Sequence, residues 1–95
     1  MQFKRKIGKE EADGSFIFIM KDKLKNFPPE NEEFELEFKG DKIKTMVEGV
    51  YCECAGPEKP HYHYHLWVKD VPLKKGMNIL INGDPKSGYK LYIRP

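Results

Sequence analysis

The stretch Phe34-Glu35-Leu36-Glu37-Phe38-Lys39-Gly40-Asp41-Lys42-Ile43-Lys44-Thr45 decides the fold class. Apolar and charged residues alternate on both sides of a Gly-Asp pair, and side chains two residues apart on an extended strand point to the same face. Glycine at the first central position of a two-residue loop favours a type II′ turn. The stretch therefore predicts a β-hairpin that turns at Gly40-Asp41.

This turn also predicts which residues face each other across the hairpin. Opposite charges directly across a strand pair are favourable, and apolar pairs on the other face complete one core side. The expected core pairs are Phe38 with Ile43, Leu36 with Thr45 and Phe34 with Val47, and the expected outer pair is Glu37 with Lys44.

Further strand signals lie on both sides of this hairpin. The run Phe16–Met20 is apolar at every position, which is typical of a strand covered on both faces. Lys21–Asn26 has room for only a short helix, because Phe27-Pro28-Pro29 ends it. Phe3 and Ile7 indicate one more strand. A last hairpin is expected, with Met77, Ile79 and Ile81 in step with Tyr89, Leu91 and Ile93 across a loop at Asn82–Gly88.

The order of the elements indicates an internal repeat. Lys21-Asp22-Lys23-Leu24 precedes the pair Gly40-Asp41, and Lys69-Asp70-Val71-Pro72-Leu73 precedes the pair Gly83-Asp84. Six or seven short strands with at most one or two helical turns favour a small closed barrel, because closure removes exposed edges. We predict a single all-β domain over residues 1–95, folded as a pseudo-symmetric β-barrel.

All cysteines and histidines of the chain lie between Cys52 and His65. If residues 55–60 form a loop, Cys54 pairs with His61 and Cys52 pairs with His63. These four side chains would then offer the sulfur and nitrogen ligands that zinc prefers. The alternative interpretation is an exposed hairpin face on which Trp67 continues the histidine side. In that interpretation the core side of the hairpin consists of Tyr62, Tyr64, Leu66 and Val68.

Basic residues cluster along the chain, while acidic residues gather between Glu30 and Glu37. Binding to a phosphate backbone requires clustered Lys and Arg, so the sequence predicts a nucleic-acid surface within a net charge of only +2. An ordinary solvated surface is the alternative. His63, His65 and Trp67 are candidates for base stacking. The candidate phosphate contacts are Lys4, Arg5, Lys6, Lys21, Lys23, Lys25, Lys69, Lys86, Lys90 and Arg94, with Lys74 and Lys75 in the same basic runs.

A family resemblance is carried by Phe16–Phe27 and Glu33–Asp41. The strand, Lys-x-Leu turn and hairpin of these residues resemble the AbrB-like swapped-hairpin barrels, although Met20 stands where those proteins usually carry proline. The repeated layout is similar to the DNA-binding pseudobarrels of plant transcription factors and of the EcoRII-type restriction enzyme recognition domain. The resemblance implies a DNA-binding module that lays two loop arms into the major groove. It also implies either a homodimer or a duplicated chain that forms the same interface internally.

Enzymatic motifs are scarce. The sequence has no Gly-x-Ser-x-Gly, phosphate loop or His-Glu-x-x-His. Pro60-His61-Tyr62-His63 resembles the start of a cupin metal site, but position 69 is Lys and no histidine follows His65. We therefore predict a non-enzymatic DNA-binding module without a cofactor. The alternatives are a zinc-binding domain that uses Cys52, Cys54, His61 and His63, and a domain that binds a partner protein through an open strand edge.

The composition predicts a cytoplasmic protein. No apolar run approaches eighteen residues and no basic and apolar leader follows Met1, so neither a membrane span nor a secretory signal is expected. Two cysteines do not make a disulfide framework, which agrees with a reducing compartment. The abundance of Lys and Glu indicates a heat-adapted source.

Overall fold

The alternating patterns of the sequence form eight strands and two short helices. The structure is a computed structural model that describes residues 2–52 and 61–94, with only the backbone of Cys52 and His61. Neither helix in this part of the chain is long and apolar enough to cross a membrane. The elements are β1 (Gln2–Lys6), α1 (Lys9–Gly14), β2 (Phe16–Ile19), η1 (Lys21–Asn26, a 3₁₀ helix), β3 (Phe34–Phe38), β4 (Asp41–Thr45), β5 (Val47–Cys52), β6 (His61–Trp67), β7 (Asn78–Asp84) and β8 (Gly88–Arg94).

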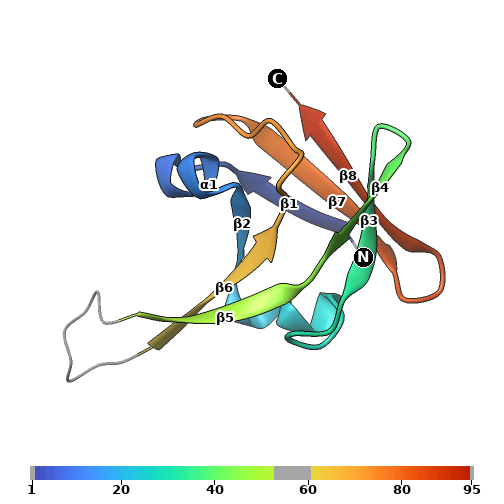
Figure 1. Ribbon diagram of the computed structural model, residues 1–95, viewed down its shortest axis with the longest axis horizontal. Helices are drawn as coiled ribbons and strands as arrows, with labels where there is room; N and C mark the ends of the chain where they lie inside the picture. The colour runs from blue at the N-terminus through green and yellow to red at the C-terminus, as the bar shows by residue number, and fades with distance from the viewer. Residues whose placement is uncertain (1, 53–60, 95) are drawn as a thin grey trace.

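The strands pair in two open sheets and not in the closed barrel that we predicted. One sheet has five strands in the order β1-β7-β8-β3-β4, and the other has three in the order β2-β6-β5 (Figure 1). Only Met46 separates β4 from β5, so the chain passes from one sheet to the other at a corner. The buried Thr45 hydroxyl donates to the Trp67 carbonyl, which joins β4 to β6 at this corner. The mostly β character is confirmed.

The predicted pseudo-symmetry does not appear in the strand pairing. A duplicated layout would relate β3 and β4 to β7 and β8, so a pairing of β3 with β8 would require a matching pairing of β7 with β4. β3 pairs with β8 in parallel, whereas the neighbours of β7 are β1 and β8. The two copies of the Lys-Asp and Gly-Asp pattern therefore occupy unequal positions in the sheets.

The first hairpin turns one residue earlier than predicted. Lys39 and Gly40 are its central residues, with φ values of 50° and 85°. Positive φ at both positions is the type I′ turn, whose twist matches that of the flanking strands. The pairs are Phe34 with Thr45, Glu35 with Lys44, Leu36 with Ile43, Glu37 with Lys42 and Phe38 with Asp41, a shift of two residues from the predicted register.

A shift of two residues leaves every side chain on its predicted face, because the side-chain period of a strand is also two. Leu36 and Phe38 are buried accordingly. In the last hairpin Ile79 lies opposite Ile93 and Ile81 lies opposite Leu91, so the two apolar rows face each other as predicted, whereas a loop at Asn82–Gly88 would have placed Ile81 opposite Tyr89. Its loop is shorter than predicted, because the strands extend to a turn that the Asp84 carboxylate closes by accepting hydrogen bonds from two backbone N–H groups.

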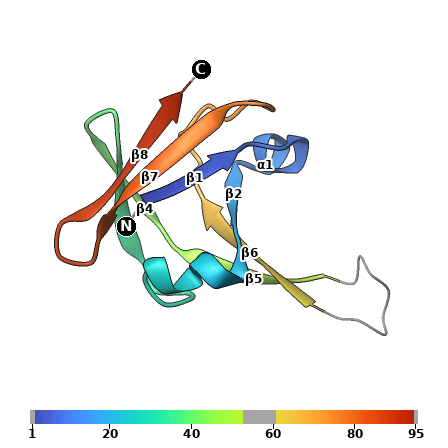
Figure 2. The same ribbon diagram turned by 180° about the vertical axis from the view of Figure 1, so that it is seen from behind.

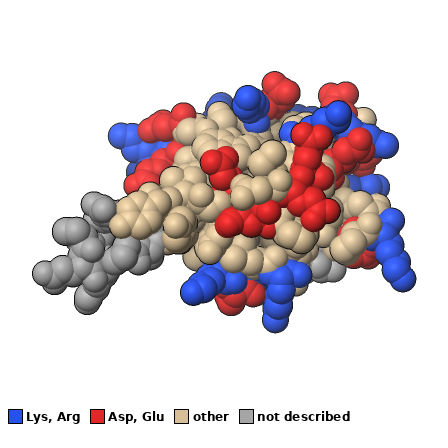
Figure 3. All heavy atoms as spheres, turned by 60° about the horizontal axis from the view of Figure 1, so that its bottom comes forward, with Lys and Arg blue, Asp and Glu red and all other residues tan. Residues whose placement is uncertain are grey.

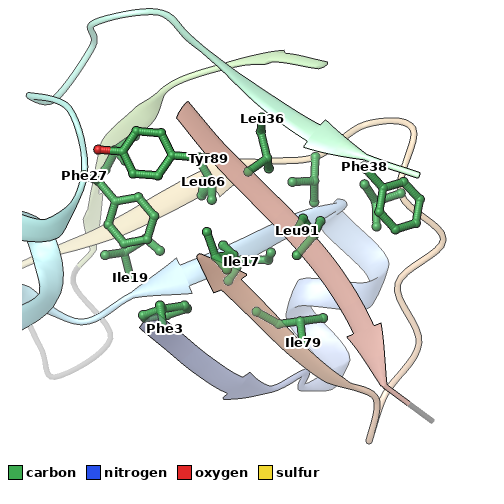
Figure 4. Packing of buried hydrophobic residues seen from close by; sticks show 14 of the residues in the cluster. Phe3, Ile17, Ile19, Phe27, Leu36, Phe38, Leu66, Ile79, Tyr89 and Leu91 are labelled. Atoms are coloured by element: carbon green, nitrogen blue, oxygen red, sulfur yellow. The ribbon is translucent and has the colours of Figure 1, made fainter. Parts of the chain in front are cut away.

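The hydrophobic core lies between the two sheets (Figure 4). β2 contributes Ile17 and Ile19, both almost fully buried, whereas on its other face Phe16 is buried and Phe18 is only partly buried. Phe27 follows η1 and stacks on the Tyr89 ring, with ring centroids 6.0 Å apart. The other buried members are Phe3, Ile7, Leu36, Phe38, Val47, Leu66, Val68, Val71, Ile79, Ile81 and Leu91.

A buried carboxylate joins the two sheets beside α1. Glu11 is 1% exposed, and its oxygens accept hydrogen bonds from Arg5 Nε at 2.8 Å and Arg5 Nη2 at 2.9 Å. They also accept the backbone N–H of Gly8 at 3.0 Å and of Phe18 at 2.9 Å. Arg5 lies on β1 and Phe18 on β2, so one side chain connects the five-stranded sheet to the three-stranded sheet.

The β5–β6 hairpin projects from the body as an arm (Figures 1 and 2). β2 pairs with β6 only as far as Tyr64, so Tyr62 lies beyond the last residue that β2 covers. Tyr62 is 59% exposed and packs edge to face against the exposed Tyr51. The prediction that Tyr62 belongs to the core is therefore wrong, whereas Leu66 and Val68 are fully buried as predicted.

Replacing Arg5 with methionine is expected to lower the free energy of unfolding by about 3–5 kcal/mol, because Glu11 would remain buried without its cation. Lys42→Met is the matched control, since the Lys42–Glu35 pair is exposed and its loss should change stability by no more than about 0.5 kcal/mol. Urea denaturation measures both variants. If the Arg5→Met variant were as stable as the natural protein, the backbone N–H groups alone would satisfy the Glu11 carboxylate.

Candidate nucleic-acid interface

The outer face of β1, β7 and β8 is basic and carries no acidic side chain from Gln2 to Lys6, from Asn78 to Asn82 or from Lys90 to Arg94. Alternation along each strand produces this face, because the odd-numbered positions of these ranges face the core. The side chains of the outer face are Gln2, Lys4, Lys6, Asn78, Leu80, Asn82, Lys90, Tyr92 and Arg94, of which Leu80 is buried. We call this set of side chains the basic face.

Strand pairing brings distant parts of the sequence together on the basic face. Lys4 lies opposite Leu80, and Leu80 lies opposite Tyr92 on the next strand. In the adjoining row Lys6 lies opposite Asn78, which in turn lies opposite Arg94. A shallow depression of about 250 Å³ runs between these rows, lined in part by Lys4, Asn78, Leu80 and Arg94.

Tyr92 is the aromatic side chain of the basic face and is 46% exposed. β3 pairs with β8 only as far as Leu91, so Tyr92 has no neighbouring strand on that side. Lys90 and Arg94 precede and follow it on the same face of β8. The ring is therefore open to a planar ligand between two cations.

Acidic residues begin at β3, on the side of β8 away from β1. Glu37 lies opposite Lys90, with 3.6 Å between Nζ and a carboxylate oxygen. Glu35 pairs with Lys42 on β4 at 3.8 Å. The outer surface of the five-stranded sheet therefore divides into the basic face over β1, β7 and β8, and a charge-paired strip over β3 and β4.

The predicted phosphate contacts separate into several places. Lys4, Lys6, Lys90 and Arg94 meet on the basic face, whereas Arg5 points to the core side and is held by Glu11. The remaining candidates are Lys21, Lys23 and Lys25 on η1, Lys69 in the turn after β6, and Lys86 in the turn between β7 and β8.

The register of the central hairpin differs from the predicted one. Cys52 pairs with His61 and Val50 pairs with His63, so the predicted pairing of Cys52 with His63 is wrong by two residues. Cys54 lies outside the described residues, as do the side chains of Cys52 and His61. The described residues hold no group of three or more side chains suited to a metal ion. Zinc binding by this hairpin stays a prediction.

The outer face of the three-stranded sheet is aromatic. The Phe16 and His65 rings stack with centroids 3.9 Å apart, and the edge of the Phe18 ring meets His65 at 5.2 Å. Trp67 Nε1 donates to a Glu48 carboxylate oxygen at 3.0 Å. His65 and Trp67 thus pack within an aromatic cluster beside carboxylates, which makes this face less suited to phosphate than the basic face.

Burial lowers the pKa of His65, and the nearby His63 lowers it further. The carboxylates of Glu48, Glu11 and Glu10 raise it, with a smaller effect than burial. His65 Nδ1 is buried and has no hydrogen-bond partner among the described residues. The folded protein therefore favours the neutral imidazole.

Several residues of the basic face have no signature in the sequence. Tyr92, Leu80 and the amide side chains of Gln2, Asn78 and Asn82 carry no motif, and only strand pairing places them beside the lysines. The available signal was the alternation of the last hairpin, where Ile79, Ile81, Leu91 and Ile93 were expected on one face, so that the mostly polar even positions fall on the other face.

The lowered pKa of His65 predicts a pH dependence of stability. The unfolded chain gains a proton near the ordinary pKa of 6.5, whereas the folded protein resists it, so stability is complete above that value and declines as the pH falls below it. His65→Phe keeps an aromatic ring and should make the urea midpoint nearly independent of pH between about pH 5 and pH 8. His63→Gln should retain most of the dependence of the midpoint on pH. An unchanged slope in His65→Phe would contradict the assignment.

Comparison with known proteins adds no family to this picture. The chain matches no protein-family model, no curated protein and no solved structure. Function is therefore inferred from the geometry of the basic face.

Proposed function

We propose that this protein is a non-enzymatic DNA-binding module and that the basic face is its binding surface. The observation that carries the proposal is the strand pairing of β1, β7 and β8, which gathers Lys4, Lys6, Lys90 and Arg94 around the exposed Tyr92. Cations gathered in this way attract a phosphate backbone, and binding releases its counterions.

The uncharged members of the basic face suit contacts to bases. Asn78 and Asn82 carry carboxamides, which pair with adenine through a donor and an acceptor. Arg94 offers the fork of donors that matches guanine. Tyr92 offers a ring for stacking, which is tolerant of sequence because every base has a flat face. The surface thus combines backbone attraction with groups that can contact bases.

The proposal keeps the role that the resemblance to AbrB-like barrels and pseudobarrels implies, but it moves the binding surface. Those proteins are expected to use projecting arms. The projecting arm of this chain has no Lys or Arg in Val47–Cys52 or in His61–Trp67. Figure 3 shows mostly uncharged side chains along the described part of the arm and mixed charges over the body. A sheet face with four cations is therefore the better partner for phosphate.

The double variant Lys4→Gln/Arg94→Gln should weaken DNA binding about tenfold or more and reduce the slope of log affinity against log salt by about 1.4–1.8, the contribution of two phosphate contacts. The matched control Lys21→Gln/Lys23→Gln removes the same charge from η1 and should bind nearly as well as the natural protein. Fluorescence anisotropy at several salt concentrations measures both variants.

Two results would contradict the proposal. Absence of salt-dependent binding by the natural protein, to single strands and to duplex alike, would remove the function itself. Equal losses in the two double variants would show that total charge matters and that the basic face is not the site.

A further inference from the structure

A groove adjoins the basic face where β3 and β8 separate. β3 ends at Phe38 and turns back through Lys39 and Gly40, whereas β8 continues past Leu91 to Arg94. The groove encloses about 550 Å³ between this turn, the end of β8 and the segment that precedes β7. Its lining residues include Phe38, Leu91, Ile93, Met77 and Pro72, which are apolar, and Lys39, Lys74 and Lys90, which are basic.

The groove has an apolar floor and a cationic rim. Phe38 and Leu91 are 8% and 2% exposed, so they form the floor. Lys39 Nζ lies 5.4 Å from the centre of the Phe38 ring, above the floor. Glu37 is the acidic lining residue, and it already pairs with Lys90. A groove with an apolar floor and ammonium groups at its rim suits a ligand that has a flat, weakly polar ring and an attached phosphate.

The groove is continuous with the basic face. Lys90 and Tyr92 belong to both, because they lie on the part of β8 that borders the groove. A chain of phosphates that crosses Lys4 and Arg94 therefore reaches Tyr92 and then the groove without leaving basic surface.

We infer that the DNA bound by this protein is single-stranded, and that one unstacked base enters the groove while Lys39 and Lys74 hold its neighbouring phosphates. The inference rests on the proposed function and adds the class of nucleic acid to it. Bases in a duplex are stacked and paired, so extruding one into an apolar groove costs free energy that a single strand does not pay.

The helix α1 and the projecting β5–β6 ribbon are poorly suited to enter a duplex groove. Reading a major groove takes a helix or a two-stranded ribbon. The helix α1 has six residues, and its first turn carries Glu10 and the buried Glu11. The β5–β6 ribbon has no cation in its described residues. These features favour a single strand on the sheet over a duplex.

An acidic peptide is the competing occupant, because it could pair with the β8 edge beyond Leu91. That free edge comprises Tyr92–Arg94, which is shorter than the usual strand of about five or six residues. A peptide there would also leave the basic face over β1 and β7 unused, whereas a nucleic-acid strand occupies both surfaces.

Anisotropy titrations with the full chain test the inference. The probes are a labelled mixed-sequence DNA strand of about 16 nucleotides, its duplex, and an abasic strand of equal length. We expect the single strand to bind at least about tenfold more tightly than the duplex and the abasic strand, which is within the range for one stacked base. Lys39→Gln/Lys74→Gln should weaken single-strand binding about tenfold and duplex binding less, with Lys21→Gln/Lys23→Gln as the charge-matched control.

The outcomes separate the two proposals. Equal binding of single strand and duplex would overturn the inference and leave the DNA-binding function standing, whereas no binding to either would remove both. Equal binding of the abasic and natural strands would overturn the insertion of a base. Displacement of the strand by a poly-glutamate peptide at lower concentration than by unlabelled strand would assign the groove to an acidic protein segment. Tighter binding of an RNA strand would overturn the choice of DNA.

Discussion

The buried carboxylate of Glu11 is the constraint on which the rest of the arrangement depends. A charge at 1% exposure is stable only when it is paired and hydrogen-bonded, and Glu11 receives donors from β1, from Gly8 and from β2. Arg5 must therefore face the core side of β1. Alternation then directs Lys4 and Lys6 outward, so the internal ion pair determines the orientation of the basic face.

Unequal strand lengths produce the candidate interface. β8 is longer than the part of it that β3 covers, so its last residues border a groove on one side and β7 on the other. The same mismatch exposes Tyr92, which would be flanked in a sheet of equal strands.

Sequence patterns predicted faces well and partners less well. The core parity of Leu36, Phe38, Ile79 and Ile81 agrees with the structure, because the choice of face depends only on alternation within one strand. The registers predicted for the β3–β4 and β5–β6 hairpins were both wrong by two residues, because a shift of two leaves the alternation of faces unchanged. In β3–β4 the same alternation is compatible with a type I′ turn at Lys39 and with a type II′ turn one residue later.

Two further differences have the same origin. The helix α1 was not predicted, because six residues around Glu11 have little helical periodicity and the segment is held by contacts to Arg5 and Phe18 from other elements. Tyr62 has the parity of a core residue, but β2 ends before reaching it and leaves it exposed. Alternation along a strand determines which face a side chain lies on, whereas its burial requires another element packed against that face.

The sequence by itself determined the mostly β class, the faces of most strands and the short helix before Phe27, because each follows from residues a few positions apart. Only the tertiary structure decided that the strands form two open sheets, that Lys4 and Arg94 share one surface, and that Arg5 does not join them. These features depend on pairing between strands far apart in the chain, and the local period of side chains carries no information about which strands become neighbours.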